Sequence, residues 1–452
     1  MPDRTIKLGV VPYGTGGPGS YQLWHDPEIP GDASVDVDWF AGVAREAEAA
    51  KLDLVFIVDS QFITPQSPPH YLNRLEPLTL LSALAMATDH IGLVGTATTS
   101  FNAPFNLARR FASLDLISKG RAGWNVVTSG DAGTAGNYGL EEHYDYDTRY
   151  GRAEEYVGLA RALWDSYEDD AFPRDRESGV FLDPTKQHAL HHEGTYFKVA
   201  GPLNLQRSPQ GQPVIFQAGD SEQGRDLGAR TAEGIFTFAP SVEAGRAFYD
   251  DVKGRARRYG RSPGDLVIMP GISVVLGDTD AEARDLEAHQ WESDHGFEHS
   301  LADISRSFGW YDFGAHDLDA PFPVEALEHA ARSFFTQAQK VTQLAQDEGL
   351  TLRETVLRTR QRRSGPFVGT ATTVADRLQE WFEAGAADGF LVGYDHPAGF
   401  RRFTAEVVPI LQERGLFRTD YDATTLRGNL GLPVPENRHT AARRERLVEE
   451  AV

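Results

Sequence analysis

The feature that most constrains the fold of this chain is a regular alternation of short apolar runs with stretches of helical periodicity. The apolar runs 6–11 and 54–58 flank a pattern over 36–50 in which the apolar residues share one helical face. Strand, helix and strand in this order form the repeating unit of parallel sheets. The alternation therefore predicts an α/β protein built on a parallel sheet.

The same order recurs along the rest of the chain. We expect further strands at 91–98, 123–128, 214–218, 234–238, 267–276 and 389–394, and helices at 77–87, 106–118, 149–164, 221–232, 241–259, 373–386 and 400–414. With the first two runs this makes eight strands, each followed by helical residues. Eight such units close a barrel, so we predict a (β/α)8 TIM barrel with insertions. A doubly wound open sheet is the alternative.

Three segments depart from the alternation. Residues 169–213 are rich in Pro, Gly and Asp and are too long for a plain connection, and residues from about 295 to 365 also break the pattern. The tail from about 415 carries a basic stretch at 438–446. We expect one barrel domain, 1–452, with two insertions and a C-terminal arm. That arm lies over the surface or over a second subunit, unless it is a solvated tail.

Composition excludes several classes of site and partner. The chain has no cysteine, which excludes disulfides, thiol nucleophiles, iron–sulfur clusters and thiolate zinc sites. Its formal net charge of −22 argues against nucleic acid or an anionic membrane as a partner, because both attract basic patches. No apolar run is long enough to span a bilayer, and the first residues lack the apolar core of a signal peptide. We therefore expect a cytoplasmic protein.

Polar residues follow several predicted strands at the ends where barrels of this type bind ligands. Asp59 follows the second strand, Thr96 and Thr98 end the third, and the run G-R-A-G-W-N-V-V-T-S, residues 120–129, ends the fourth. A strand buried on both faces should be almost wholly apolar, so the polar end of this run indicates a ligand site. The alternatives are a helix N-cap at Asp59 and a fourth strand that simply enters a loop.

The residues after the fifth strand suit a phosphate. Gly219 is small, and Ser221 is expected to begin a helix whose N-terminus attracts anions. Hydroxyls and amides around the barrel mouth suit a hydrogen-bonding heterocycle, so the two features together predict flavin mononucleotide (FMN). Dinucleotides and nucleoside triphosphates fit less well, because neither G-x-G-x-x-G after the first strand nor G-x-x-x-x-G-K-[ST] occurs.

Other motifs give no competing site. His188, His191 and His192 form the densest histidine cluster, but a metal site would need carboxylates at ligand spacing on a rigid element, and this segment is irregular. The G-x-S-x-G elbow of many hydrolases is absent. We therefore expect no metal. Trp24, in the loop after the first strand, is expected to cover a ligand or to pack on a lid.

Four long stretches resemble one family. They are A-R-R-F-A-S-L-D-L-I-S-K-G-R-A-G-W-N-V-V-T-S (108–129), R-Y-G-R-A-E-E-Y (149–156), G-P-L-N-L-Q-R-S-P-Q-G-Q-P-V-I-F-Q-A-G (201–219) and T-L-R-G-N-L-G-L (425–432). With these stretches in this order, nearly the whole chain is similar to the FMN-dependent monooxygenases of the bacterial luciferase superfamily. This group includes relatives of the nitrilotriacetate, dibenzothiophene-sulfone and long-chain alkane monooxygenases and the pristinamycin synthase large subunits.

The resemblance implies a luciferase-like TIM barrel and a two-component oxygenase. Such an enzyme takes reduced FMN from a separate NAD(P)H-dependent flavin reductase and uses O2 to oxygenate a small organic substrate. The resemblance also assigns flavin contacts to Asp59, Thr98, Ser129, Tyr150 and Ser221. We expect a homo-oligomer, either a dimer or a tetramer.

The same resemblance implies that Thr96 and Asn125 have catalytic roles at the edge of the flavin. The residue chemistry agrees with this assignment. Neutral hydrogen-bonding groups can serve an oxygenase without an acid–base pair, because the reaction needs positioning and exclusion of water.

The chain departs from the family pattern at four places. Tyr146 stands where the family has a phosphate-side histidine, and Asp220 places an anion beside the expected phosphate, where it must point away or weaken flavin binding. At the substrate mouth, Trp24 and His25 belong to W-H-D-P instead of W-R-H-P, which makes a polyanionic aminocarboxylate substrate less favoured. Gly130 cannot replace the histidine that some relatives have after Ser129.

The sequence therefore predicts the oxygenase component of a two-component FMN-dependent monooxygenase. Two alternatives remain open at this point. One is a dehydrogenase of the same superfamily that uses a deazaflavin and needs no O2, and the other is a flavin-binding barrel without catalysis.

Overall fold

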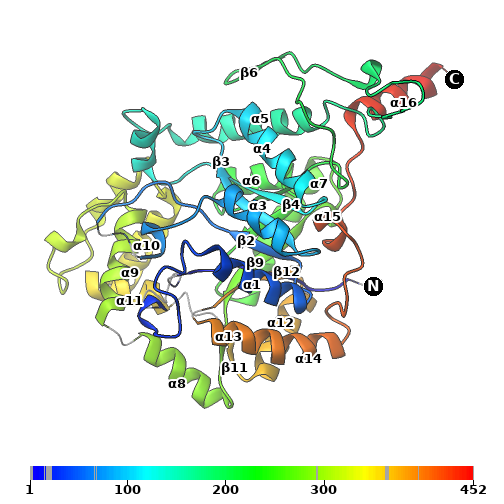
Figure 1. Cartoon of the computed structure of the whole chain (residues 1–452). Helices are drawn as coiled ribbons and strands as arrows, with labels where there is room; N and C mark the ends of the chain where they lie inside the picture. Colours follow the sequence, from blue (N-terminus) through cyan, green and yellow to red (C-terminus); the bar gives the residue numbers. More distant parts are fainter. Residues whose placement is uncertain are drawn as a thin grey trace.

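The computed structural model describes residues 4–14, 16, 23–65, 67, 69–291, 294–361, 366–394 and 396–450. Eight parallel strands close into a barrel in the order β1-β12-β9-β8-β7-β4-β3-β2 (Figure 1). They are β1 (Lys7–Val10), β2 (Leu54–Ile57), β3 (Gly92–Thr98), β4 (Ala122–Val127), β7 (Val214–Gln217), β8 (Gly234–Thr237), β9 (Val267–Ser273) and β12 (Gly389–Gly393). The predicted TIM barrel is confirmed, and the open sheet is excluded.

Helices surround the barrel and connect its strands. The barrel helices are α1 (Val37–Ala49), α3 (Pro77–Ala87), α4 (Pro104–Ile117), α5 (Tyr146–Trp164), α6 (Glu222–Thr231), α7 (Val242–Arg258), α12 (Ala371–Glu383), α13 (Pro397–Arg402) and α14 (Val408–Glu413). The others are α2 (Pro69–Leu72), α8 (Asp280–Trp291), α9 (Asp294–Ser307), α10 (Phe335–Glu348), α11 (Leu352–Gln361), α15 (Leu426–Asn429) and α16 (Arg438–Glu450). Two small sheets pair β5 (His192–Glu193) with β6 (Lys198–Val199) and β10 (Val275–Leu276) with β11 (Val368–Gly369).

Some predicted element boundaries were wrong for local reasons. The helix expected from residue 149 begins at Tyr146, because Asp145 caps it by accepting a hydrogen bond from the Thr148 amide at 2.9 Å. The helix expected over 400–414 consists of α13, a π-helical segment (Phe403–Val407) and α14. Pro409 has no N–H and crowds the carbonyl four residues earlier, which accounts for the wider turn before it.

The barrel interior is apolar below its mouth. Alternate residues of the strands point inward and pack together, among them Leu54, Phe56, Val94, Val214, Phe216, Met269 and Leu391. The Phe56 ring lies 6.0 Å from the Phe216 ring and 5.6 Å from the Phe236 ring. These rings form a floor under the polar residues at the strand ends.

The segment 425–432 closes the opposite end of the barrel. Its Leu426, Leu430 and Leu432 join the interior cluster. Leu426 occupies space that a side chain at position 92 would need, since a Cβ on Gly92 would lie 2.3 Å from its Cδ1 atom. The stretch T-L-R-G-N-L-G-L is thus a plug that fills the end of the barrel opposite the polar strand ends. The tail beyond 415 is therefore not wholly a surface arm.

A buried arginine fixes this plug. Arg427 is 1% exposed and forms an ion pair with Glu233 at 2.6 Å. Its other N–H groups donate to the carbonyls of Gln210, Gln212 and Pro433. Glu233 also accepts a hydrogen bond from the Ile215 amide on β7. The pair therefore ties the C-terminal segment to a barrel strand.

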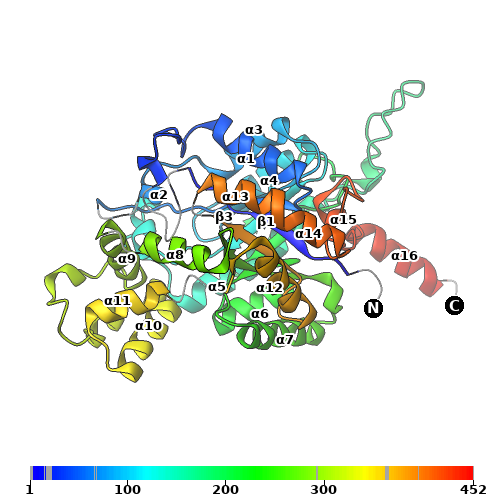
Figure 2. The same cartoon turned by 90° about the horizontal axis from the view of Figure 1, so that it is seen from below.

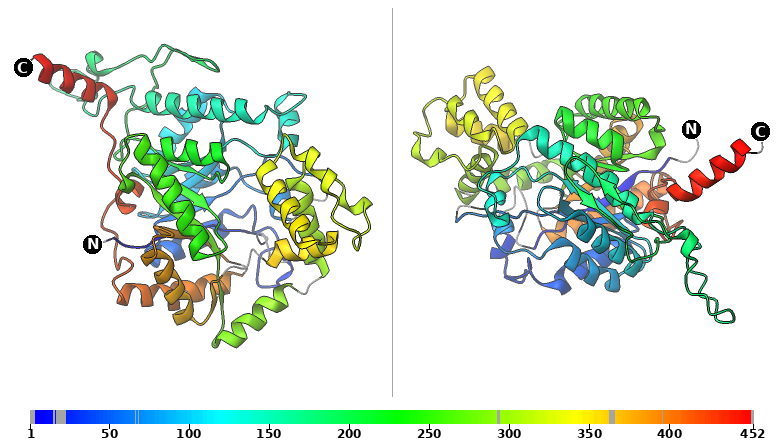
Figure 3. Two further views of the ribbon diagram at one scale, coloured as in Figure 1. Left: turned by 180° about the vertical axis from the view of Figure 1, so that it is seen from behind. Right: turned by 90° about the horizontal axis from the view of Figure 1, so that it is seen from above.

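The two insertions lie at different ends of the molecule. The second contains α9, α10 and α11, has its own apolar cluster around Phe308, Phe313 and Phe322, and lies at the end opposite α15 (Figure 1). Part of the first, residues 169–213, projects from the body near α16 (Figures 2 and 3), whereas Gln210 and Gln212 near its end are buried. No helix in the described parts of the chain combines the length and hydropathy needed to cross a membrane.

Replacing Arg427 by Gln should leave Glu233 as a buried charge with a weakened partner. The loss of one member of a buried ion pair typically costs about 3–5 kcal/mol, so we expect a clearly lower midpoint in urea or thermal unfolding. Arg444→Gln is the matched control, because Arg444 and its partner Glu436 are largely exposed and such pairs contribute about 0–1 kcal/mol. Equal midpoints for the two variants would contradict the role given to Arg427.

Candidate functional site

Two neighbouring strands present polar side chains inside the barrel, directly above the aromatic floor. Thr96 on β3 is in register with Asn125 on β4, and the Asn125 Nδ2 group donates to Thr96 Oγ1 at 2.9 Å. Both residues are buried. Asn125 Oδ1 is also buried and has no hydrogen-bond partner among the described residues. The free group of this amide is therefore an acceptor, which suits a ligand with an N–H donor.

A second polar pair lies one step nearer the mouth. Ser129 Oγ donates to Thr98 Oγ1 at 2.7 Å. Ser129 has a φ of +52°, a left-handed backbone conformation that is unfavourable for residues other than glycine. Such strain persists only where the surroundings hold it in place.

Two side chains hold the Ser129 backbone by its carbonyl oxygen. His143 Nε2 donates to it at 2.6 Å, and Arg149 Nη1 donates to it at 3.0 Å. Both side chains are buried, His143 at 3% exposure and Arg149 at 2%. Burial, and next the charge of Arg149, lower the pKa of His143 to about 4. The imidazole is therefore neutral near pH 7, and its Nδ1 atom has no partner among the described residues.

Asp59 follows β2 at the same rim. Burial raises the pKa of its carboxyl group, and the charge of Arg74 opposes that shift. Gln61 Nε2 donates to Asp59 Oδ2 at 3.2 Å. The helix N-cap alternative for Asp59 does not apply, because the next helix, α2, begins only at Pro69.

The third part of the rim joins α5 to α6. The hydroxyl groups of Tyr150 and Ser221 lie 3.2 Å apart and share a hydrogen bond. Ser221 is the N-cap of α6 and accepts a hydrogen bond from the Gly224 amide at 3.0 Å. Burial raises the pKa of Tyr150 to about 12, so it remains a neutral hydroxyl. A Cβ at Gly219 would lie 2.7 Å from the Gly224 Cα, so this turn requires glycine.

Two of the departures from the family pattern, Tyr146 and Asp220, lie near this rim. Tyr146 lies on the first turn of α5, with its ring 4.9 Å from the Tyr150 ring. Asp220 forms an ion pair with Arg225 at 2.7 Å and a second one with Lys340 of α10. The Asp220 charge is thus compensated within the protein, and it does not oppose an anion at Ser221.

The residues expected at the substrate mouth lie in a short 3-10 helix, Leu23–His25. Trp24 is 46% exposed, and its ring meets the His25 ring edge-on at 3.8 Å. The neighbouring Asp26 carboxylate contacts His396 Nε2 at 2.9 Å. The acidic residue of W-H-D-P is therefore partly balanced by a histidine from the other end of the chain.

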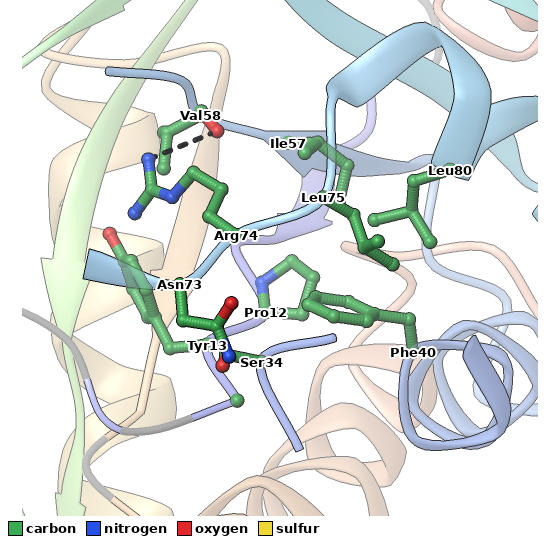
Figure 4. A pocket seen from close by; sticks show the side chains of 11 residues that line it. Pro12, Tyr13, Ser34, Phe40, Ile57, Val58, Asn73, Arg74, Leu75 and Leu80 are labelled. Atoms are coloured by element: carbon green, nitrogen blue, oxygen red, sulfur yellow. Dashed lines mark hydrogen bonds between the residues drawn. The ribbon is translucent and has the colours of Figure 1, made fainter. Parts of the chain in front are cut away.

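A pocket opens at the ends of β1 and β2 (Figure 4). Its polar lining comes from Tyr13, Ser34, Asn73 and Arg74, and its apolar lining includes Phe40, Ile57 and Leu80. Ser34 Oγ is buried without a partner among the described residues. Arg74 Nη1 donates to the Val58 carbonyl at 3.3 Å, which orients the guanidinium along the pocket wall. The pocket thus joins an apolar side with several hydrogen-bond donors.

The helical insertion docks on the loop that follows β4. Asp131, which is 4% exposed, accepts hydrogen bonds from Arg306 at 3.2 Å and from Trp310 at 3.3 Å. The Phe334 ring packs on Gly130, where an added Cβ would lie 2.5 Å from a ring carbon. The space beside Gly130 is thus filled by the insertion, and the insertion shields this side of the mouth from water.

The sequence did not single out His143, Arg149 or Arg306. Arg149 lies within the recognised stretch 149–156, but its contact with Ser129 crosses between a loop and a helix and has no local signature. The histidine cluster lies in the first insertion. His188 contacts Glu168 at 3.0 Å, and His192 contacts Glu155 of α5 at 2.9 Å.

Comparison with known proteins gives a consistent result. The sequence profile of the luciferase-like monooxygenases matches residues 19–388. The N-acetyl-S-(2-succino)cysteine monooxygenase of Bacillus subtilis (strain 168) is 44% identical over 96% of this chain and 98% of its own length. Nitrilotriacetate monooxygenase component A of Aminobacter aminovorans is 41% identical over 92% of this chain and 94% of its own. A riboflavin lyase solved with modified FMN and riboflavin is 32% identical, with a TM-score of 0.83 over 96% of this chain and 97% of its own.

His143 should make the folded protein sensitive to mild acid. Its pKa is lowered on folding, so between pH 6.5 and 4 the unfolded chain binds a proton that the folded chain does not, and stability falls as the pH falls. A shift to about 4 corresponds to a loss of about 2 kcal/mol at pH 5. We expect His143→Gln, which keeps a donor, to lose less stability than the wild type between pH 7.5 and pH 5 in urea unfolding. Equal losses would contradict this role.

Proposed function

The chain belongs to the luciferase-like monooxygenase family, and from this we propose that it is the oxygenase component of a two-component system that uses reduced FMN and O2. The observation that supports this most strongly is the ring of neutral polar groups at the carboxyl ends of the strands. Asn125 Oδ1 is a buried acceptor without a partner, and Ser221 begins a helix beside a turn that requires glycine. A flavin ring and a phosphate provide the groups that such a site would bind.

We assign the flavin contacts to residues on three sides of the mouth. In this proposal Asp59, Thr98 and Ser129 bind the ring system, and Tyr146, Tyr150 and Ser221 bind the phosphate. Asp220 stays in its ion pairs with Arg225 and Lys340 and supports the turn from outside. When bound, reduced FMN would supply the electrons that activate O2.

The protein's own contribution is positioning and exclusion of water. Asn125 is fixed by Thr96, so its Oδ1 atom would accept a hydrogen bond from the flavin at one defined place above the aromatic floor. The helical insertion, held by Asp131 and Arg306, covers one side of the mouth. A shielded site with hydrogen-bonding groups in fixed positions favours transfer of oxygen to the substrate over release of reduced oxygen to water.

The proposed system includes a partner that supplies reduced flavin. The name of the nitrilotriacetate relative, component A, is that of one part of a larger system. We also propose a homo-oligomer. The first insertion and α16 project from the body and expose Phe181 at 64%, Leu447 at 61% and Val448 at 61%, which is typical of surfaces covered in an assembly (Figure 2).

We propose a substrate that carries carboxylate groups. The two curated relatives described above are named for polycarboxylic acids. In this chain the pocket of Figure 4 places the Arg74 guanidinium, the Asn73 amide and two hydroxyl groups beside an apolar wall. The acidic residue of W-H-D-P opposes such a substrate less than expected from the sequence, because Asp26 is paired with His396.

The flavin and O2 requirement can be tested with the purified protein and reduced FMN generated by an added reductase. We expect the protein to change the time course of flavin reoxidation under O2 in stopped-flow absorbance. Asp59→Ala and Ser129→Ala should each weaken flavin affinity by about tenfold, the effect of losing about 1.4 kcal/mol. Asp38→Ala on the exposed face of α1 is the control. Reoxidation unaffected by the protein would contradict the proposal and favour the deazaflavin or non-catalytic alternatives.

The substrate class can be tested by titrating succinate and its uncharged diamide, succinamide, into the FMN complex by calorimetry. We expect succinate to bind at least tenfold more tightly, because Arg74 pairs with a carboxylate and not with an amide. Arg74→Gln should abolish the difference, whereas Arg109→Gln on the exposed side of α4 should not. Equal binding of the two compounds to the wild type would refute this assignment.

A further inference from the structure

The guanidinium of Arg149 is a buried cation without a recorded counter-ion. It is 2% exposed and forms no ion pair within the described residues. Its Nη1 group donates to the Ser129 carbonyl, but Nε and Nη2 are buried and have no partner in the described structure. An unpaired buried charge with unsatisfied donors is strongly unfavourable unless a ligand completes it.

Two other buried arginines show how this chain normally satisfies such a group. Arg121 is 3% exposed and makes five side-chain hydrogen bonds to carbonyl and hydroxyl oxygens of 85–118. Arg427 pairs with Glu233 and uses its remaining donors on carbonyls. Arg149 makes only one such bond. Unlike these two arginines, it has two buried nitrogens without a hydrogen-bond partner and no ion pair among the described residues.

The surroundings of Arg149 form the rim that we assigned to the flavin. Its guanidinium lies 5.3 Å from the Tyr146 ring centre, and the next residue on α5, Tyr150, bonds to Ser221 at the start of α6. His143, which shares the Ser129 carbonyl with it, is neutral near pH 7. Asp220 is held by its own two cations. Among the described residues, no carboxylate of this part of the rim forms an ion pair with Arg149, although the Asp145 charge acts on it electrostatically.

We propose that Arg149 determines the specificity of this site for a phosphate monoester, so that the barrel binds FMN in preference to riboflavin. This inference rests on the proposed function. Tyr146, Tyr150 and Ser221 can supply hydroxyl groups to a phosphate, but none of them carries charge. Arg149 supplies the charge that balances the phosphate, and its bond to the Ser129 carbonyl joins phosphate recognition to the strained residue at the flavin ring.

The test measures affinity for oxidised FMN and for riboflavin by quenching of flavin fluorescence, which requires no turnover. We expect the wild type to prefer FMN by at least tenfold. Arg149→Gln should weaken FMN binding at least tenfold and change riboflavin binding less than twofold. Arg149→Lys, which keeps the charge, should retain most of the preference. Arg152→Gln on the same helix is the control, because its guanidinium stacks on Tyr144 and Phe197 instead.

Inorganic phosphate separates a phosphate site from a purely structural role. It should compete with FMN in the wild type and not in Arg149→Gln. Equal weakening of FMN and riboflavin in Arg149→Gln would show that Arg149 only supports Ser129, and would overturn the inference. So would an unchanged FMN preference in both Arg149 variants.

The binding test and the flavin reoxidation test can fail separately. A protein that prefers FMN through Arg149 but leaves flavin reoxidation unaffected would contradict only the oxygenase assignment. A protein that alters reoxidation but binds FMN no better than riboflavin would contradict only the role of Arg149.

Discussion

Closure of the barrel is the constraint on which the rest of the structure depends. Because all eight strands are parallel, closure brings their carboxyl ends to one rim and leaves the opposite end open. The chain fills that end with Leu426, Leu430 and Leu432 and anchors them through Arg427 and Glu233. The interior cluster is then apolar up to Phe56 and Phe216, and Thr96, Thr98 and Asn125 provide polar side chains towards the rim. The location of the site therefore follows from topology before any residue at the rim is considered.

The electrostatics of the rim differ from those of the whole protein. The chain carries a formal net charge of −22, yet Asp220 beside the assigned phosphate is held by Arg225 and Lys340. Lys340 belongs to α10 of the helical insertion, and Asp131 after β4 is held by Arg306 of α9. The insertion thus covers the mouth and also pairs with Asp131 and Asp220. Arg149 has no ion-pair partner among the described residues, and two of its buried donors are unpaired.

Much of the fold could be predicted from the sequence, because the strand and helix periods are local properties. All eight expected strands are present, and Thr96, Thr98 and Asn125 end strands or lie within them as predicted. The contacts within the site could not be predicted from the sequence to the same extent. The hydrogen bonds from His143 and Arg149 to Ser129 depend on how a loop and a helix fold over β4, and no spacing rule encodes them. The stretch 425–432 was recognised in the sequence as similar to the family. Its position in the end of the barrel could be seen only in the structure of the closed sheet.

The most direct test of the account is a crystal structure of the protein with FMN. We predict the phosphate at the start of α6, within hydrogen-bond distance of the Tyr150 and Ser221 hydroxyls and on the side of Arg149, with the ring system over Asn125 and beside Ser129. Flavin bound away from the carboxyl ends of the strands, or bound with its phosphate remote from Ser221, would contradict the account.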